Sequence, residues 1–312
     1  MNEPRRRGPI ARIAIGLWDT VNFTRRLVFN LLFLALLLML LAVMFGGGKL
    51  APLSERSTLV VAPEGRLVEQ YSCDPLSRSF ARATNSNDCR EVRLRDMLRA
   101  LDSARTDKRI ERVALHLDEL EPSGFASLRE VAAAIAKVKA AGKQVVAFGD
   151  NYSQAQYLLA AQANEIYLDP MSQGGVMLEG LASYRQYFRE ALQDKLGVDM
   201  HLFKVGEYKS AAEPYILDAA SPESNEASLF WMNDIWQRML VDAGKARGIA
   251  PATLAARADA LAEQVAAVKG DLAQLALNQK LVDGLKTREQ VEDLLVERGV
   301  ADDSAEGGFR HV

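Results

Sequence analysis

Histidine and cysteine are scarce in this chain of 312 residues, and neither forms a pattern that could hold a metal. The three histidines, His116, His201 and His311, lie far apart and are not grouped with cysteines or carboxylates at metal-ligand spacing. The only two cysteines are Cys73 and Cys89, which polar residues separate. We therefore expect no zinc site.

An excess of positive charge is also lacking. Lys and Arg number 38 against 41 for Asp and Glu, which leaves a net charge of −3. No basic stripe with interleaved aromatic residues appears, so we expect no nucleic-acid partner. The length allows one large α/β domain or two small ones, because single cores stop growing at roughly 250–300 residues.

Charge is absent from a long apolar run near the N-terminus. Residues 28–47, VFNLLFLALLLMLLAVMFGG, are interrupted only by Asn30, and about twenty such residues suffice for a helix to cross a hydrocarbon core. The arginines before this run are Arg5, Arg6, Arg7, Arg12, Arg25 and Arg26. By the positive-inside rule, residues 1–27 form a cytoplasmic basic segment and residues 48–312 lie on the far side of the membrane.

Two alternatives concern the same region. A cleaved signal peptide would have a shorter apolar core and a small-x-small cleavage site, neither of which is evident, so we favour an uncleaved anchor. Residues 10–23 are weakly amphipathic and are expected either to lie on the inner membrane surface or to form a disordered basic arm.

Cys73 and Cys89 both follow the predicted anchor. An oxidising compartment would permit a disulfide that closes the polar loop between them. Two free thiols are the alternative, and we favour the bridge on the grounds of compartment.

Segments typical of strands and helices alternate after the anchor. A first strand starts at Ser57, and further strands are expected within 109–120, 144–150, 165–170 and 198–206. The intervening helices are expected within 91–107, 124–143, 153–163 and 184–197. Strands that alternate with such helices indicate parallel βαβ units, so the fold class is α/β.

The last third of the chain is predicted to be helical. A long helix should begin after Ser221 as N-cap, with Pro222 at its first position, and further helices run to about Arg298. Trp231 and Trp236 on this helix are expected in a core or an interface. The polar, glycine-broken end, residues 302–312, is expected to be a frayed tail or the start of a further element.

Lys209 is the first candidate for chemistry. It lies in VGEYKSAAEPY, residues 205–215, where an expected helix would begin. A lysine acts as a general base only where its surroundings let it lose its proton near neutral pH. Uncharged neighbours favour that, whereas Glu207 or Glu213 would oppose it by reaching the ammonium. On these residues alone, a solvated lysine is the simpler interpretation.

A nucleophile would have to accompany such a base. The turn that follows the strand at 144–150 could support an oxyanion with backbone amides, and its nearest hydroxyl belongs to Ser153. Ser153 is equally suited to cap the next helix. Gly174 and Gly175 could bring amides close to a substrate or form a plain turn, and Asp150 is interpreted as a turn former.

Three longer stretches carry a family resemblance: SQAQYLLAAQANEIYLDP, VDMHLFKVGEYKSAAEPY and SPESNEASLFWMNDIWQ. With them the chain resembles the N-terminal half of the long, two-repeat type of bacterial signal peptide peptidase, the protease IV family. The resemblance implies a crotonase-like α/β fold, shared with the caseinolytic proteases. It also implies a serine–lysine dyad that works without metal or organic cofactor.

In that family the lysine comes from the N-terminal half and the serine from a G-D-x-A-A-S-G-G-Y turn of the C-terminal half. The pattern G-x-Y-K-S-A-x-E-P matches this chain from Gly206 to Pro214, so the resemblance assigns the general base to Lys209. The counterpart of the serine turn is GDNYSQAQY, residues 149–157, in which Gln154 takes the place of the nucleophile. The nucleophile is therefore expected from an absent second half.

The resemblance further implies degradation of cleaved, hydrophobic signal peptides by a serine endopeptidase. This chain would be its N-terminal repeat, anchored in the inner-membrane lipid with the main domain in the periplasm, and alone it would be inactive. The expected partners are the C-terminal repeat and further copies of the same chain in a homo-oligomer. The alternatives are a catalytically silent membrane scaffold of the same fold and a crotonase-like acyl-CoA enzyme, which the location outside the cytoplasm disfavours.

Overall fold

The computed structural model describes residues 9–45, 53–84 and 86–312. By its internal contacts the chain divides into two compact units, Met1–Pro52 and Leu53–Val312.

The described part of the first unit is helix α1 (Pro9–Phe45). Its segment Ile15–Leu41 is long and apolar enough to cross a membrane. The helix begins well before Val28, so residues 10–23 are helical and the prediction of a disordered arm is wrong there. The last two residues of the predicted anchor, Gly46 and Gly47, lie outside the described residues.

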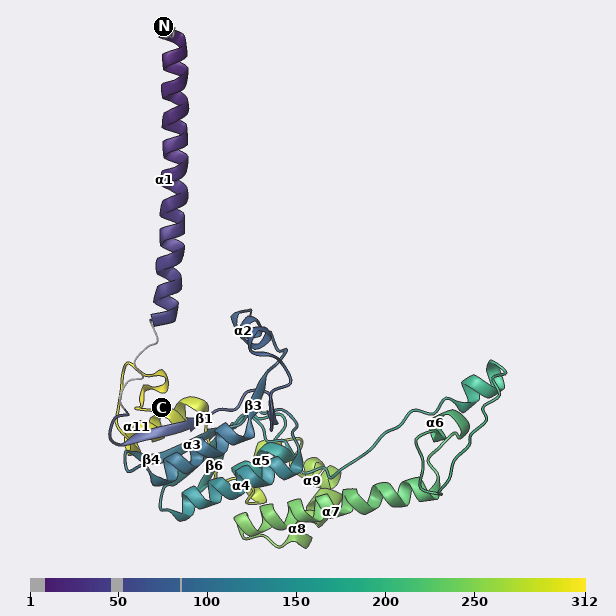
Figure 1. Ribbon diagram of the computed structural model, residues 1–312. Helices are drawn as coiled ribbons and strands as arrows, with labels where there is room; N and C mark the ends of the chain where they lie inside the picture. Colours follow the sequence, from purple (N-terminus) through teal and green to yellow (C-terminus); the bar gives the residue numbers. More distant parts are fainter. Residues whose placement is uncertain (1–8, 46–52, 85) are drawn as a thin grey trace. The chain divides into compact units, whose positions relative to one another are not determined.

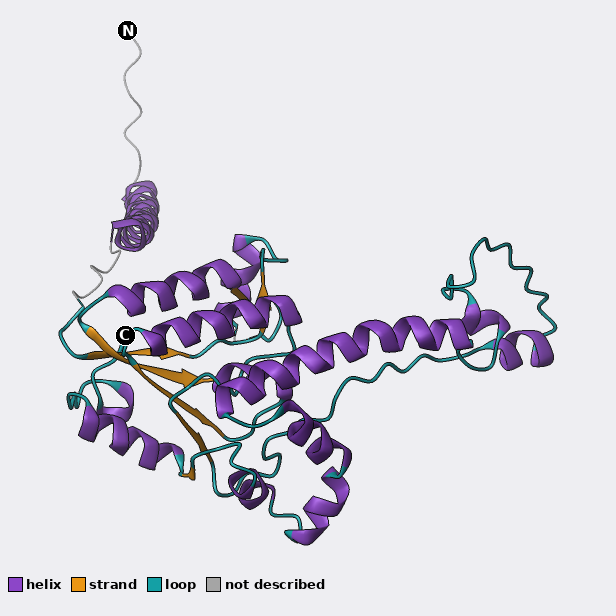
Figure 2. Cartoon of the chain, turned by 90° about the horizontal axis from the view of Figure 1, so that it is seen from below, coloured by secondary structure: helices purple, strands orange, loops and turns teal. Residues whose placement is uncertain are grey.

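A parallel sheet forms the centre of the second unit (Figure 2). Its five strands follow the order β1-β4-β5-β6-β7, and β2 pairs with β3 in a separate two-stranded parallel sheet. The strands are β1 (Ser57–Val61), β2 (Arg66–Val68), β3 (Glu91–Arg93), β4 (Ile110–His116), β5 (Gln144–Gly149), β6 (Glu165–Leu168) and β7 (Gly284–Leu285). The predicted α/β class with parallel strands is confirmed.

Helices connect the strands and make up most of the C-terminal third. They are α2 (Pro75–Ala83), α3 (Leu94–Thr106), α4 (Phe125–Ala140), α5 (Gln154–Ala160), α6 (Glu213–Ile216), α7 (Pro222–Arg247), α8 (Pro251–Asp259), α9 (Leu261–Ala267), α10 (Leu272–Asn278) and α11 (Arg288–Arg298). Ser221 caps α7 as predicted, because its side chain accepts a hydrogen bond from the Ser224 N–H.

Strand β4 is buried on both faces. Val113 and Leu115 belong to the large core cluster that includes residues of α3 and α4, whereas Ala114 packs in a second cluster with Leu295 of α11. All three β4 side chains are at most 1% exposed. The sequence showed apolar alternation, which is typical of a half-buried strand, but a central parallel strand is covered from both sides.

The C-terminal end extends the sheet beyond β1, so the prediction of a frayed tail is wrong. Phe309 is buried. The Thr58 N–H donates to the Arg310 carbonyl at 3.0 Å, the Val60 N–H to the Val312 carbonyl at 2.9 Å, and the Val312 N–H to the Thr58 carbonyl at 3.0 Å. These bonds cover an edge that would otherwise expose its backbone groups.

Residues 179–220, here called the arm, run outward from the core beside α7, and α7 itself leads the chain back to the core (Figures 1 and 2). The helix predicted at 184–197 is reduced to a π-helical turn, Glu190–Lys195. The strand predicted at 198–206 does not form, because no strand of the described residues lies beside it to supply hydrogen bonds. Phe203 and Val205 there are 95% and 84% exposed.

The two tryptophans of α7, Trp231 and Trp236, lie in different environments. Trp236 packs against the large core cluster, whereas Trp231 near the arm is half exposed. The expectation of a core or interface position is met by Trp236, and Trp231 stays a candidate for an interface.

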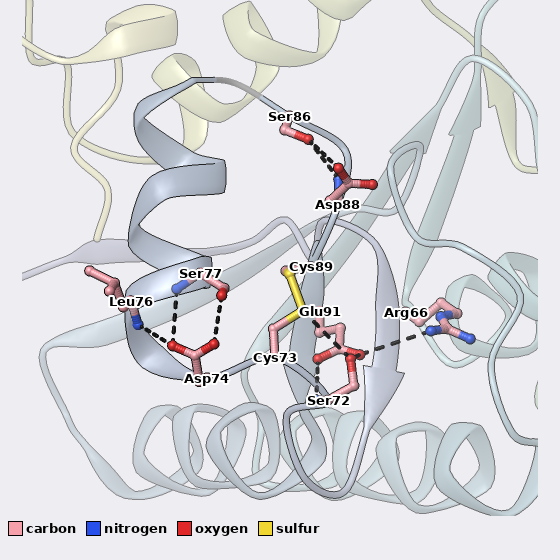
Figure 3. Close-up of a disulfide and its surroundings, with 10 residues drawn as sticks. All are labelled: Arg66, Ser72, Cys73, Asp74, Leu76, Ser77, Ser86, Asp88, Cys89 and Glu91. Atoms are coloured by element: carbon pink, nitrogen blue, oxygen red, sulfur yellow. Dashed lines mark hydrogen bonds and ion pairs between the residues drawn. A yellow bond between two sulfur atoms is a disulfide. The ribbon is translucent and has the colours of Figure 1, made fainter.

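Cys73 and Cys89 form the predicted disulfide, with their Cα atoms 5.9 Å apart (Figure 3). The bond closes a loop that contains α2, whose N-terminus is capped by the Asp74 carboxylate. At the base of the loop Glu91 accepts hydrogen bonds from Ser72. The loop has few buried side chains, so the covalent bond is its main restraint.

Replacing both cysteines with alanine should lower the free energy of unfolding by up to about 3 kcal/mol, since the bridge no longer restricts the unfolded chain. Urea unfolding of oxidised protein checks this, and mass spectrometry with and without reductant checks the bond. Free thiols in protein exported to an oxidising compartment would contradict the structure.

His116 ends β4, with its ring edge-on to Phe148 at 6.4 Å between centroids. Burial lowers the pKa of His116, and the positive charges of Arg288 and His311 lower it further. The folded chain therefore favours the neutral imidazole.

Acidification should destabilise the fold through His116. Because its pKa is depressed in the folded state, the unfolded chain binds more protons, and the free energy of unfolding falls as pH drops below about 6.5. His116→Gln should flatten the loss between about pH 7.5 and 5.5, as measured by urea unfolding. The control, His201→Gln on the exposed arm, should keep the full dependence. Equal slopes in all three proteins would refute the assignment.

Candidate active site

The turn at residues 149–157 follows β5 at the carboxyl end of the sheet, where open α/β sheets place their ligand sites. Neighbouring segments hold its backbone. The Asp150 N–H donates to the Asp118 carboxylate at 2.8 Å, and the Tyr152 N–H donates to the Gly175 carbonyl at 2.9 Å. The turn is therefore fixed before any ligand arrives.

Ser153 caps α5 in a reciprocal arrangement. Its hydroxyl accepts from the Gln156 N–H at 3.4 Å, and the Gln156 side-chain oxygen accepts from the Ser153 N–H at 2.8 Å. The Gln156 amide also donates to the Leu117 carbonyl at 2.8 Å, which joins the turn to the end of β4. The capping role predicted for Ser153 is confirmed. The partner Gln156 was missed, although the Ser-x-x-Gln spacing is a signal for it.

A cavity of about 480 Å³ opens beside this turn. Its lining residues are Asp118, Asp150, Asn151, Tyr152, Ser153, Gln156, Met177 and Glu179. None of these described side chains is a lysine or a histidine, and Asp118, Asp150 and Glu179 contribute carboxylates to the lining.

The cavity is also negative. Burial raises the pKa of Asp118, and the charge of Asp150 acts in the same direction, while Arg288 at 3.6 Å opposes both. Carboxylates there repel the negative charge that develops on a carbonyl oxygen during acyl transfer. The described lining of this cavity is therefore acidic, which is unfavourable for an oxyanion.

Gln154 joins the turn to the base of the arm. Its amide nitrogen donates to the Gly180 carbonyl at 2.9 Å, and its buried side-chain oxygen has no hydrogen-bond partner among the described residues. The residue at the position of the family nucleophile therefore has a structural contact with the arm.

Gly174 and Gly175 form a plain turn. The Gly174 N–H donates to the Asn151 side chain at 2.7 Å, and the Gly175 N–H donates to the Ser172 hydroxyl at 2.9 Å. Because both amides are occupied, they are not available to an oxyanion. A side chain on Gly175 would collide with Leu272, and its φ of +58° also favours glycine.

Lys209 is exposed on the arm, in the turn of residues 206–212. The expectation that it starts a helix is wrong, since the nearest helix, α6, begins at Glu213. Among the described residues no carboxylate lies within ion-pair distance of its ammonium. Glu213, which could have paired with it, instead accepts hydrogen bonds from Ser221.

Lys209 and the turn at 149–157 are not brought together. Figure 1 shows α6 near the end of the arm, remote from α5, and Figure 2 shows the same separation from another side. The two candidate elements of one active site thus lie at opposite ends of an extended structure.

Sequence comparison identifies the relatives of this chain. The model of peptidase family S49 matches residues 137–299. The chain is 35% identical over 286 residues to Protease 4 of Salmonella typhi, an alignment that covers 90% of this chain and 46% of that protein. It is 32% identical over 277 residues to Protease 4 of Haemophilus influenzae, covering 87% and 44%. It is 27% identical over 142 residues to the chloroplastic serine protease SPPA of Arabidopsis thaliana, covering 46% and 20%.

The chain thus spans less than half the length of the two Protease 4 relatives that it matches. The family match begins at the end of α4 and includes strands β5, β6 and β7, the turn with Gln154, and the arm with Lys209. It ends just after α11. By this match the chain belongs to peptidase family S49.

Proposed function

We propose that this chain is the lysine-bearing half of a membrane-anchored serine endopeptidase that degrades cleaved signal peptides. The observation that carries the proposal is the division of the site. Lys209 is exposed on the arm with no carboxylate of the described residues at ion-pair distance, while the turn at 149–157 has Gln154 where the family resemblance expects the serine. Such a division is useful only if a serine from another polypeptide segment meets the arm.

In the proposed reaction, neutral Lys209 accepts the proton of a serine hydroxyl from the second half. The serine oxygen bonds to the peptide carbonyl carbon, and backbone amides stabilise the oxyanion. As the C–N bond breaks, the lysine ammonium returns the proton to the leaving amine. Water, deprotonated by the same lysine, then hydrolyses the acyl-enzyme. The chemistry needs no metal and no organic cofactor.

The finer fold assignment is part of the proposal. A crotonase-like fold in two repeats is consistent with the parallel five-stranded sheet and the separate β2–β3 sheet. Contact with the second repeat and with further copies of this chain would cover the apolar side chains of the arm and of the adjoining part of α7. Phe203 and Phe230 there are 95% and 82% exposed.

The proposed location is the bacterial inner membrane, with the main domain in the periplasm. The apolar part of α1 from Val28 onward would span the bilayer, and the arginines before it favour a cytoplasmic N-terminus. The Cys73–Cys89 disulfide supports an oxidising compartment for the main domain. Hydrophobic signal peptides, released within the membrane, would be the substrates.

One observation favours a second candidate, a catalytically silent scaffold. Gln154 replaces the nucleophile and holds the Gly180 carbonyl, which is a structural use of that position. The acyl-CoA enzyme has no comparable support, because its substrates belong to the cytoplasm.

Lys209→Ala should reduce hydrolysis of a hydrophobic fluorogenic peptide by about 10²–10⁴-fold in the native assembly that contains this chain. The melting temperature should not change, because Lys209 is exposed. The control is Lys195→Ala, which removes another exposed lysine of the arm and should leave the rate unchanged. Full activity of Lys209→Ala would contradict the assignment of Lys209 as the general base.

A serine-reactive fluorophosphonate should label no residue of this chain, because the Ser153 hydroxyl is engaged as the cap of α5. It should label a serine outside residues 1–312 when the native assembly is treated. Mass spectrometry of the labelled peptides distinguishes the cases: label on Ser153 would overturn the register, and no label anywhere would favour the scaffold.

A further inference from the structure

The turn that carries Lys209, residues 206–212, has few hydrogen bonds of its own. Among the described residues its backbone bonds are a long one at 3.5 Å, from the Lys209 N–H to the Gly206 carbonyl, and two at 3.1 Å, from the Glu213 N–H to the Ser210 carbonyl and from the Tyr215 N–H to the Ala212 carbonyl. Gly206 has a φ of +103°, a conformation that other residues rarely adopt. Contacts from outside the turn must therefore determine where the lysine points.

Glu213 supplies the first of these contacts. Its side-chain oxygens accept from the Ser221 hydroxyl at 2.6 Å and from the Ser221 N–H at 3.2 Å, and the residue is only 1% exposed. The same Ser221 oxygen accepts from the Ser224 N–H at 3.1 Å. The serine hydroxyl thus donates to Glu213 while it caps α7, which links the end of the lysine turn to a helix of 26 residues.

The environment keeps Glu213 ionised. Burial by itself raises the pKa of Glu213, but the hydrogen bonds from Ser221, with the positive charges of Lys204 and Arg185, hold it below its usual value. The N-terminus of α7 adds favourable positive potential. A charged acceptor strengthens the bond to Ser221.

Tyr208 supplies the second contact, from the residue directly before the lysine. Its phenol lies 3.0 Å from a carboxylate oxygen of Glu226, one turn into α7. This bond raises the pKa of Tyr208, so the phenol stays protonated and donates. Two hydrogen bonds therefore join the lysine turn to the N-terminal end of α7, and both carboxylates are occupied by hydroxyl donors.

We infer that Glu213 and Tyr208 are positioning residues for Lys209, which they act on through Ser221 and Glu226 on α7. The two contacts, here called the α7 clamp, set the direction of the lysine and keep both carboxylates away from its ammonium. Arg185, which donates to the Ser210 carbonyl at 3.2 Å, adds a cation beside the turn and not an anion. The inference rests on the proposed function, in which Lys209 must lose a proton.

The test uses steady-state kinetics of the native assembly with a hydrophobic fluorogenic peptide. Ser221→Ala and Tyr208→Phe each break one contact of the clamp and should lower kcat about 10- to 100-fold, since misplacement by about 1 Å can cost that much. KM should stay within about twofold, because the clamp residues orient a base that acts only in the chemical step. Ser221→Thr keeps the hydroxyl and should restore most of the rate.

The matched control is Thr287→Ala. Thr287 caps α11 as Ser221 caps α7, with a hydrogen bond from the Gln290 N–H, but α11 lies outside the arm. Equal losses of kcat in Ser221→Ala and Thr287→Ala would show general destabilisation and overturn the inference. Tyr208→Phe leaves the α7 cap intact, so it decides the question if Ser221→Ala does not fold.

Lys209→Ala in the same assay distinguishes failure of the α7 clamp from failure of the proposed function. If Lys209→Ala is inactive while Ser221→Ala and Tyr208→Phe keep the wild-type kcat, the clamp is refuted and the proposed function stands. Full activity of Lys209→Ala refutes the proposed function and the clamp with it. The expected pattern is inactivity of Lys209→Ala, partial loss in both clamp variants and rescue by Ser221→Thr.

Discussion

Burial of the central strands on both faces is the constraint on which the larger unit depends. In β4 and β5, Val113 and Val145 pack in the large core cluster and Ala114 and Val146 pack in the second cluster, all at most 1% exposed, so both faces of the sheet are covered. Once both faces are covered, only the ends of the strands remain for polar residues. The turn at 149–157 lies at one of these strand ends. Its Asp150 N–H donates to the carboxylate of Asp118, just after β4.

Hydrogen bonds from two buried tyrosines connect α5 and its turn to other parts of the core. The Tyr157 hydroxyl donates to the Leu281 carbonyl at 2.9 Å, and the Tyr152 hydroxyl to the Tyr167 carbonyl at 3.0 Å. Each phenol is buried, so each must have an acceptor within the protein. These bonds join α5 and its turn to residues more than a hundred positions later as well as to neighbouring β6.

Local signals in the sequence predicted most of the sheet and its covering helices. The amphipathic helix before Gly142 and the cap at Ser221 depend on neighbours in the sequence, and both formed as expected. The strand at 198–206 failed because a strand depends on a partner that lies elsewhere. The pairing of residues 310–312 with β1 could not be seen for the same reason, since the two segments are far apart in the sequence.

The site was less predictable than the fold. The exposure of Lys209 agrees with the simpler interpretation of residues 205–215, a solvated lysine. The occupation of Glu213 does not follow from that spacing, because Ser221, which donates to it, comes eight residues later. Only the family resemblance singled out Lys209 and the exchange at Gln154. Spacing alone did predict Ser153 as a cap.

Helix α7 connects the arm to the core, so a small change in its direction moves the arm. Its 26 residues span roughly 39 Å at 1.5 Å per residue, and only the end near Met239 and Leu240 is packed against the core. Pro222 lies roughly 26 Å along the helix from Met239, so a bend of roughly five degrees at that end would move the arm by about 2 Å, which exceeds the tolerance of a proton transfer. If the arm docks onto a second half as proposed, that contact would have to limit this movement, and catalytic precision would be a property of the assembled particle and not of one chain.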